Sequence, residues 1–546
     1  MKRPKFNRVE IDLDHLKEII ERAPLSDSDR KDLDSAIETL AYLTIELDNK
    51  RTTLQRLRGM LFGARTEKAS TVLGGVADAK PSPEATEPGE LPAGTSGDAP
   101  AEATTPKPKR KGHGRNSAAS YRGADAINVQ HPTLKPQDPC PACGKGKVYE
   151  LKVPAVLVRI TGCAPLGAQA FECQRLRCNA CGGVFVAEAP AEAGPNKYDE
   201  SASAMIGMLK YGTGFPFFRL ARLQAGLGIP LPVGTQWQVV EQAADLLEPA
   251  HHELLRQAAQ GEVLHNDDTP VKILAMMGAA ATQRDASDPQ RTGMFTTGIV
   301  ARLGALRIAL FFTGTHHAGE NLAALLEQRA LELPRPIQMC DALSRNYAGE
   351  METILANCLS HSRRKFVDVF TSFPGECKVV IEALREVYHN DRIAADDEMS
   401  PAQRLAWHRK KSKPIMHRLH KWATACIKKK RVEENSGLGE AIGYMLKHWR
   451  KLTLFLRVAG APLDNNICER ILKIAILHRK NALFFKTLNG ARVGDIFMSL
   501  IHTAELCGAD PFDYLVTLLR HHAQVSASPA RWMPWNYREA LAQLAA

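Results

Sequence analysis

The sequence predicts a multidomain α/β protein, and three observations support this prediction. Its 546 residues are too many for a single hydrophobic core, and 44% of them are hydrophobic, which is enough to fill several cores. A low-complexity segment near residue 90 separates a helical N-terminus from the rest of the chain. Beyond residue 262, strand-like runs and a helical run follow one another. We therefore expect several domains, of which the largest contains both strands and helices.

The net charge indicates what kind of partner the protein could bind, and the apolar stretches and cysteine content indicate its cellular compartment. The formal net charge of +11 and the pI near 9.0 suit a polyanion such as nucleic acid, although such an excess is also common without one. No apolar stretch has the length of a signal-peptide core or of a bilayer span, and 12 cysteines are too sparse for a disulfide scaffold. We therefore expect a cytoplasmic protein with no membrane partner.

Residues 1–69 are predicted to form an N-terminal helical, coiled-coil region. Leucine recurs at every seventh position from Leu33 to Leu61, with charged residues between and no proline. The alternate core positions are mixed, since Ile37 is apolar whereas Thr44 and Arg51 are not. A self-associating coil is therefore the expectation, and a single amphipathic helix is the alternative.

Residues 70–116 are predicted to be a disordered linker with a basic end. The segment is dominated by Ala, Pro, Gly, Glu, Ser and Thr, which cannot bury enough apolar surface to order the chain. Its basic end, KPKRKGHGR from Lys107 to Arg115, has no aromatic neighbour that could stack on a base. This run is either an arm that contacts phosphates or a solvated tail.

Residues 117–192 carry the pattern of a zinc ribbon. CPACG and CNACGG each place two cysteines, separated by two residues, just before a glycine, and each forms a tight knuckle. Two knuckles supply the four thiolates of a tetrahedral structural Zn²⁺ site and leave no open position for catalysis. The alternative is four free thiols. The predicted Zn²⁺ ligands are Cys140, Cys143, Cys178 and Cys181.

Residues 193–257 are predicted to form a helix-turn-helix-like segment that binds DNA. One helix ends near Gly226, a short turn with prolines follows, and a second helix is expected to begin with a cap near Thr235. The first turns of the second helix carry glutamines but no Arg or Lys, so reading of a DNA groove is not obvious. A plain helical hairpin is the alternative.

Residues 258–500 are predicted to form an α/β catalytic domain with an RNase H-like core. VLHND, GMFTTGIVAR and RIALFFTG have the pattern of three strands joined by short turns, and the helical stretch NLAALLEQRA and the strand PIQMCDA follow. In an RNase H-like core this order places the first and fourth strands side by side, which would bring Asp267 and Asp341 together. Two close carboxylates become favourable when divalent cations lie between them.

A third carboxylate is expected on a later helix. In APLDNNICERILKIAILHRKNALFF, Pro462 and Asp464 are typical of a helix start, and Glu469 lies about one turn further on. The alternative for Glu469 is a surface acid paired with a neighbouring base.

The 128 residues between Asp341 and Glu469 are too many for an uninterrupted core of this type. Residues 371–460, which are helical in pattern and basic, are therefore predicted to be an α-helical insertion. Trp407 and Trp422 either stack on bases or belong to the core of this insertion. Residues 501–546 are predicted to be a C-terminal helical appendage.

Basic side chains near the acids are candidates for binding phosphates, although Lys and Arg beside a helix are often only solvated. In CLSHSRRKF, we expect Cys358 to pack, whereas His361 either contacts a phosphate or a metal ligand or is an ordinary histidine at a helix start. The candidate phosphate-binding residues are His361, Arg363, Arg364, Lys365, Arg470, Lys473, Arg479 and Lys480.

Four motifs in order resemble those of a known family. DDTPVKIL, CDALSRNYAG, CLSHSRRKF and LDNNICERILKIAILHRKNALFF closely resemble the insertion sequence 66 family of DDE transposases. The resemblance extends to the N-terminal RLRGMLFGARTEK, the two Cys-x-x-Cys pairs and GADPFDYL, so it covers nearly the whole chain outside the linker.

The resemblance implies a catalytic triad of Asp267, Asp341 and Glu469. In the family the first acid is followed by a second acid, Thr and Pro, which assigns the metal-ligand role to Asp267 and leaves Asp268 as its neighbour. Successive strand residues point to opposite faces, so only one of the two can face the site. We therefore expect Asp268 to be exposed or to cap the turn.

The resemblance also implies the chemistry and the partners. Carboxylate oxygens select Mg²⁺ or Mn²⁺, and two such ions assist phosphodiester displacement. The expected reaction is cleavage of DNA at the terminal inverted repeats of an insertion sequence, followed by strand transfer to target DNA. The implied setting is a bacterial protein associated with the nucleoid, a homodimer or higher oligomer, and small accessory transposition proteins.

Two other classes of function stay open at this point. A DNA-binding regulator, or a catalytically inactive copy, needs the zinc ribbon, the coil and the basic charge but no catalysis. A structure-selective nuclease on the same fold would cut branched DNA without preferring particular ends. Metal-dependent cleavage by the purified protein separates the regulator from both enzymes.

Overall fold

The computed structural model describes residues 132–141, 143, 145–149, 164–177, 184–277, 291–349 and 351–545, together with Leu33. The predicted linker, and the predicted coiled coil apart from Leu33, lie outside the described residues. Residues 335–347 and 352–466 form one compact unit, here called unit 1, and the remaining described residues from 132 onward form unit 2. None of the described helices combines the length and the apolar character that a membrane span requires.

Unit 2 contains the three strands that were expected as an antiparallel meander. β3 (Val263–Pro270), β4 (Phe295–Leu303) and β5 (Leu306–Gly314) pair antiparallel in that order. Leu303 pairs with Leu306 across a two-residue turn, where Gly304 has a φ of 58°, the positive value that a type II′ hairpin requires at its first central position. The three strand predictions are confirmed.

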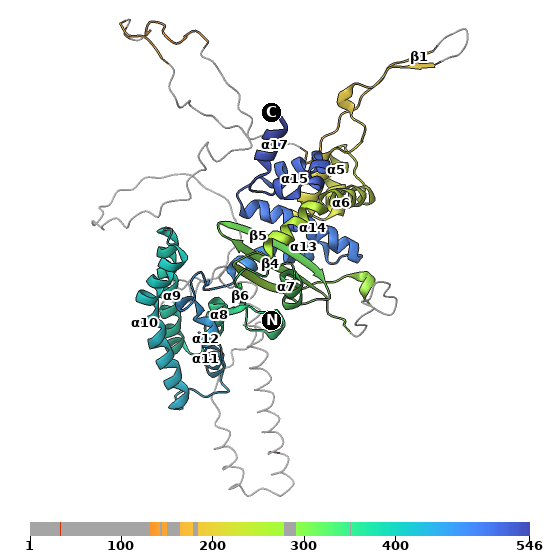
Figure 1. Ribbon diagram of the computed structural model, residues 1–546. Helices are drawn as coiled ribbons and strands as arrows, with labels where there is room; N and C mark the ends of the chain where they lie inside the picture. Colours follow the sequence, from red (N-terminus) through yellow and green to blue (C-terminus); the bar gives the residue numbers. More distant parts are fainter. Residues whose placement is uncertain are drawn as a thin grey trace, which may run out of the picture. The chain divides into compact units, whose positions relative to one another are not determined.

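Helix α14 (Leu488–Leu506) lies along β5 (Figure 1) and occupies hydrogen-bonding groups of that strand. The backbone N–H groups of Ala309 and Phe311 donate to the hydroxyls of Thr503 and Ser499, each at 3.0 Å. The N–H of Thr313 donates to Asp495 at 2.7 Å. The spacing of the side chains on α14 matches the spacing of the N–H groups on β5, because four helical residues rise about 6 Å and two strand residues about 6.6 Å. A side-chain row of α14 therefore follows the edge of β5.

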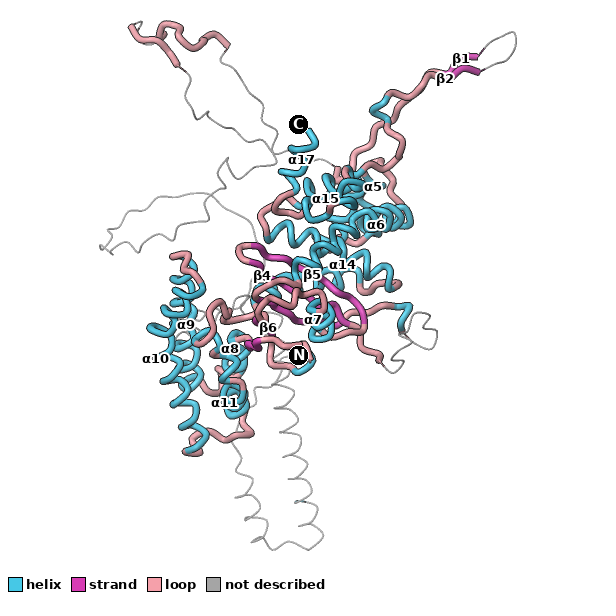
Figure 2. The backbone as a smooth tube through the Cα atoms, viewed as in Figure 1, coloured by secondary structure: helices cyan, strands magenta, loops and turns pink. Residues whose placement is uncertain are grey.

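The remaining helices of unit 2 build one hydrophobic core around the three strands. Helix α7 (Ala318–Leu326), the predicted helix after the meander, packs on β3 and β4. Helix α6 packs on α14, beside which it lies in Figure 2, and also on α4. The other elements of unit 2 are β1 (Arg175–Arg177), β2 (Val184–Val186), η2 (Ala191–Ala193), α4 (Glu200–Gly207), the π-helix η3 (Met208–Gly212), α5 (Phe217–Gly226), α6 (Val233–Ala258), η4 (Leu274–Met276), α13 (Asn466–Ala482), α15 (Pro511–Arg520), α16 (His522–Ala527), η7 (Pro529–Trp532) and α17 (Tyr537–Ala545).

The predicted helix-turn-helix-like segment contains two helices joined by a turn, α5 and α6. Helix α6 begins at Val233, and no side chain caps it, so the expected cap near Thr235 is absent from this described segment. Gln236 is fully buried, and its side-chain amide donates to the carbonyls of Phe217 and Leu231. Gln236 therefore fixes the turn and is not presented to a DNA groove. DNA binding by this segment stays a prediction.

Unit 1 contains two parallel strands and a set of helices. β6 (Ile337–Cys340) is the predicted strand before Asp341, whereas β7 (Ile354–Asn357), its parallel partner, was not predicted. The region predicted as an insertion is helical, with α9 and α10 packed side by side (Figure 1). Trp407 donates from its indole N–H to the carbonyl of Asn390. The elements are η5 (Ser344–Asn346), α8 (Leu359–Asp368), α9 (Pro374–Asp396), α10 (Pro401–Lys428), α11 (Gly437–Lys447), α12 (Trp449–Leu452) and η6 (Leu454–Leu456).

Candidate active site

The first predicted acid, Asp267, lies on β3 directly opposite Gly298 of β4. Residues directly opposite each other in an antiparallel pair project from the same face of the sheet. A Cβ atom built on Gly298 would lie 3.0 Å from Leu472 of α13, so that face is the one covered by α13. Asp267 therefore projects toward the face of α13, as the alternation of strand residues predicts.

Helix α13 approaches this face through its first turn. The thiol of Cys468 donates to the carbonyl of Gly298 at 3.2 Å. Glu469, the predicted third acid, is the next residue and lies in the first turn of α13, with Oε1 buried. Gly298 permits the approach, because any side chain there would meet Leu472. Unit 2 thus places Glu469 one residue from the contact of α13 with Gly298, the strand partner of Asp267.

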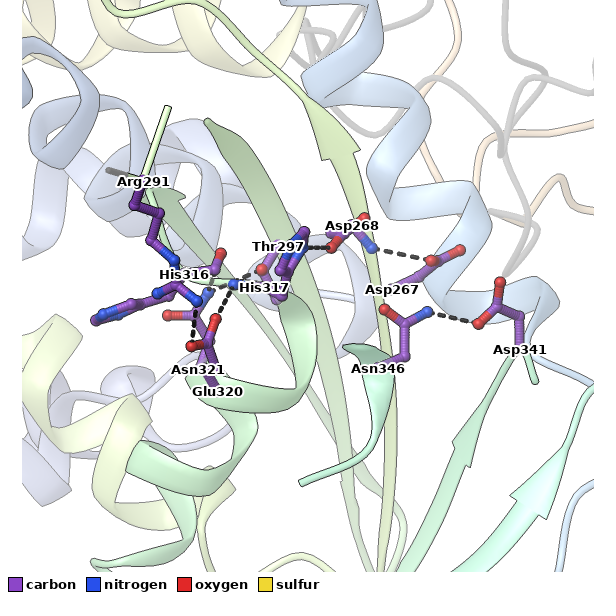
Figure 3. A network of polar contacts seen from close by, with 10 residues as sticks. All are labelled: Asp267, Asp268, Arg291, Thr297, His316, His317, Glu320, Asn321, Asp341 and Asn346. Carbon is purple, nitrogen blue, oxygen red and sulfur yellow. Dashed lines mark hydrogen bonds and ion pairs between the residues drawn. The ribbon is translucent and has the colours of Figure 1, made fainter. Parts of the chain in front are cut away.

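Asp268 projects to the other face of β3, toward α7, and the expectation that it would be exposed or cap a turn is wrong. Its side chain is fully buried, and His317 Nδ1 donates to Asp268 Oδ2 at 2.9 Å (Figure 3). Thr297, the strand partner of Asp268, accepts a hydrogen bond from Asn321 of α7. Because His317 is the N-cap residue of α7, the buried carboxylate ties β3 to the start of that helix.

The same face carries a second carboxylate that orders the start of α7. Glu320 accepts the backbone N–H of His317 at 2.7 Å and pairs with Arg291 at 2.5 Å (Figure 3). These contacts lower the pKa of Glu320, although burial acts in the opposite direction and is the largest single influence on it. The α7 face of β3 is thus a closed network in which each carboxylate has a partner from the protein itself.

The second predicted acid, Asp341, directly follows β6 in unit 1. Its Oδ1 accepts hydrogen bonds from the side chain of Asn346 at 2.6 Å (Figure 3) and from the backbone N–H of Leu343 at 3.0 Å. Asn357 of β7 donates to its backbone carbonyl. Among the described residues, Oδ2 has no hydrogen-bond donor. Asp341 is therefore held through one carboxylate oxygen while the other stays available to a cation.

Two tyrosines near Asp341 were missed by sequence reasoning. Burial, followed by the charge of Asp341, raises the pKa of Tyr444 to about 12, and the pKa of Tyr347 is also raised, chiefly by burial. Lys365 lies 4.7 Å from the ring centre of Tyr444, and Lys451 lies 4.5 Å from that of Tyr347. Only the three-dimensional contacts identify Lys451 and the two tyrosines, since no spacing in the sequence links them to the acids.

The predicted phosphate-binding residues differ in exposure. Lys365, Arg470, Lys473 and Lys480 are exposed, whereas Arg363 is buried and His361 and Arg364 are partly buried. Arg479 donates to the hydroxyl of Thr269 at 3.0 Å and to the carbonyl of Pro270, and so fastens α13 to the end of β3. Cys358 is fully buried at the start of α8, where its sulfur accepts the N–H of Asn465. A role at phosphate stays a prediction for these basic residues.

The first of the two predicted zinc knuckles lies within the described residues. The N–H of Cys140 donates to the carbonyl of Gly146 at 2.7 Å, which closes the turn. The pKa of the Cys143 thiol is lowered, chiefly by the backbone N–H of Gly146, as suits a thiolate ligand. β1 ends just before Cys178 and β2 begins just after Gly183, but the second knuckle with Cys178 and Cys181 lies outside the described residues. The Zn²⁺ site stays a prediction.

Comparison with protein families identifies the chain. Residues 196–493, just over half of it, match the model described as "Transposase IS66 family". The chain belongs to the IS66 family of transposases. The matched segment begins in the predicted helix-turn-helix-like segment and contains Asp267, Asp341 and Glu469, so the candidate acids lie inside the IS66 region.

The chain is also similar along most of its length to proteins of Sinorhizobium fredii. It is 26% identical over 540 residues to "Uncharacterized protein y4jD", covering 92% of this chain and 96% of that protein. It is 25% identical over 451 residues to "Uncharacterized protein y4hP", covering 77% of each. These names assign no activity, so the IS66 membership carries the functional conclusion.

Proposed function

We propose that this IS66 protein is a DDE transposase that binds the terminal inverted repeats of an insertion sequence, cleaves the DNA there and transfers the freed strand to target DNA. One observation carries the proposal. Asp267 projects toward α13 at the point where that helix touches Gly298, and Glu469 lies in the adjoining turn. Asp341, which directly follows β6, is the second acid in the order of the motifs.

The donor set suits hard divalent cations. Asp267, Asp341 and Glu469 offer carboxylate oxygens only, which Mg²⁺ and Mn²⁺ prefer to nitrogen or sulfur. Bound Mg²⁺ would activate the attacking oxygen and neutralise charge on the leaving oxygen of a phosphodiester. The protein's own part is positional: Asn346 and the N–H of Leu343 orient Asp341, and exposed bases such as Lys365 and Lys473 are available to hold the DNA backbone.

The same proposal gives a role to each of the remaining parts of the chain. The zinc ribbon and the helix-turn-helix-like segment would contact the repeat, and the N-terminal coil would join protomers of a dimer or higher oligomer. Association with the nucleoid follows from DNA as the partner. Small accessory transposition proteins are expected to take part in the complete reaction.

The test is a cleavage assay with a linear DNA that carries the inverted repeats flanking this gene, incubated with Mg²⁺ or Mn²⁺. We expect the wild type to cut at the repeat boundary. Asp267→Asn and Glu469→Gln should each lower the rate at least about 1,000-fold, because each removes a charged ligand of the cation. Repeat binding, measured without added Mg²⁺ or Mn²⁺ so that the predicted Zn²⁺ site keeps its ion, should stay within about twofold of wild type.

Asp268→Asn is the matched control, since it makes the same change one residue further on, where the side chain faces α7. Its folded fraction should retain cleavage within about tenfold. If Asp267→Asn and Asp268→Asn lose cleavage equally, Asp267 has no special role. Repeat binding without cleavage by the wild type, with accessory proteins added, would favour the DNA-binding regulator or an inactive copy.

A further inference from the structure

Helix α10 has a one-sided charge that nothing in the candidate active site uses. Its 28 residues, Pro401–Lys428, include eight Lys or Arg and no Asp or Glu. Helix α9, which packs against it, has three Lys or Arg and five Asp or Glu in its 23 residues. The two helices pack against each other in the same unit, so the difference is not a general property of this part of the chain.

Four of the eight Lys and Arg residues of α10 form a line on the side away from its core. Its buried residues, among them His408, Ser412 and Leu419, pack toward α9 and η6. At 100° per residue, five exposed residues fall within an arc of about 80° on the opposite side and span about 27 Å along the axis. We call this line the α10 ridge: Lys410, Lys413, His417, Lys421 and Lys428.

The lysines of the ridge have no polar partner among the described residues. None of the four lysine side chains makes an ion pair or hydrogen bond with any residue that the structure describes. Three of the four other cations of α10 do have partners: Arg404 pairs with Asp391 at 2.6 Å, Arg409 donates to the carbonyl of Leu456, and Lys411 lies 5.3 Å from the ring centre of Trp407. The helix therefore separates its structural cations from the ridge.

This arrangement lowers the stability of α10 itself. Like charges four residues apart on a helix repel by a few tenths of a kcal/mol per pair, and Arg409 with Lys413 is such a pair. A face that served only solubility would alternate acids with bases, as α9 does. A polyanion lying along the ridge would turn the repulsion into attraction.

We propose that the α10 ridge binds the phosphate backbone of double-stranded DNA without regard to sequence. Duplex DNA carries one charge per about 1.7 Å of its axis, so a ridge of about 27 Å faces the phosphates of roughly eight base pairs. Lysines on flexible stems suit backbone contacts rather than base edges. Since DNA is the expected partner, the inference rests on the proposed function, which it extends with a second contact surface on the helical region.

The experiment compares two triple variants of the full chain that remove the same charge. The ridge variant is Lys410→Gln/Lys413→Gln/Lys421→Gln, and the control on α9 is Lys378→Gln/Arg385→Gln/Arg392→Gln; all six residues are exposed. Binding to a labelled duplex of about 30 base pairs and arbitrary sequence is measured at several salt concentrations, with Mg²⁺ and Mn²⁺ left out to prevent cleavage. Thermal unfolding of both variants confirms that they fold.

We expect the ridge variant to bind at least about tenfold more weakly at 0.1 M salt and to lower the slope of log K against log salt by about three, one per lysine. The α9 control should change the slope by less than about one. Equal slopes in the two variants, or wild-type affinity in the ridge variant, would overturn the inference. Neither outcome depends on cleavage. The binding assay therefore tests the ridge, and the cleavage assay separately tests the proposed catalysis.

Discussion

The two faces of β3 receive two adjacent aspartates and place them in different surroundings. On one face, Asp268 is fully buried and paired with His317, and the network continues to Glu320 and Arg291. On the other face, Asp267 projects beside α13, whose contact with β4 is made through a glycine and whose first turn carries Glu469.

The difference shows that one strand can place two adjacent carboxylates in unlike surroundings on its two faces. A carboxylate whose partners come from the protein contributes to stability, because its burial is offset by a hydrogen bond. A carboxylate beside a second acid is unfavourable until a cation binds, which is the usual state of a metal site. Variants on each side of the sheet test whether the two faces differ in this way.

The largest effect is expected at a third aspartate that contacts the same strands, Asp495 of α14. It is buried against β5 with only neutral hydrogen-bond partners, and burial raises its pKa to about 7. Because the folded state holds this proton more tightly than the unfolded chain, its contribution to stability is complete below about pH 4 and is lost as the pH rises to 7. The loss reaches up to about 4 kcal/mol.

Asp495→Asn isolates the contribution of this proton, because the amide keeps the shape of the carboxyl group. Its oxygen can accept the N–H of Thr313, and its NH₂ group can donate to the Thr313 hydroxyl, which in the wild type donates to Asp495 Oδ1. Urea unfolding between pH 4 and pH 8 should show that the wild type loses stability relative to the variant as the pH rises. His251 and His478, whose pKa values burial lowers to about 4 and about 3, titrate in both proteins and cancel. Parallel profiles would contradict the assignment.

The next effect is expected at the α7 face. Asp268→Ala should lower the free energy of unfolding by about 3 kcal/mol, because it leaves His317 without its carboxylate partner. Denaturant unfolding measures the change. His317→Ala, and the double variant with Asp268→Ala, complete a cycle in which a coupling of at least about 1 kcal/mol is expected. A coupling near zero would show that the pair contributes nothing.

The smallest effect is expected at Gly298, where the α13 face depends on the absence of a side chain. Gly298→Ala places a methyl group 3.0 Å from Leu472 and should cost about 1–2 kcal/mol of stability while lowering cleavage about tenfold. Gly314→Ala in β5, where nothing lies within 4 Å, is the control and should change neither quantity appreciably. Full cleavage in Gly298→Ala would mean that the position of α13 is not critical.

The local elements were largely predictable from the sequence. Strand-like runs joined by short turns identified β3, β4 and β5, and the Asp464 start of α13 is confirmed by its hydrogen bond to the N–H of Asn466. The alternation of side chains along a strand also predicted that Asp267 and Asp268 would face opposite ways. These features depend on neighbours within a few residues, which a single sequence contains. The RNase H-like core as a whole stays a prediction.

Contacts between distant segments were not predictable. Asp268 was expected to be exposed, because nothing in the sequence indicates that His317, 49 residues away, reaches it. Arg479 was expected to hold phosphate, yet it fastens α13 to β3 over 210 residues. The short strand β7 escaped detection because four residues are too few to show a period. In each case the deciding partner is set by packing rather than by spacing.

The row of Asp495, Ser499 and Thr503 along β5 has a further consequence for how copies of this protein can associate. An unpaired strand edge invites a strand from another chain and is a common start of aggregation. Here the outward N–H groups of Ala309, Phe311 and Thr313 are already taken by side chains of the protein's own helix. Along this edge the meander cannot be extended by a strand of a neighbouring molecule, so copies of the protein can come close together without their sheets joining at β5.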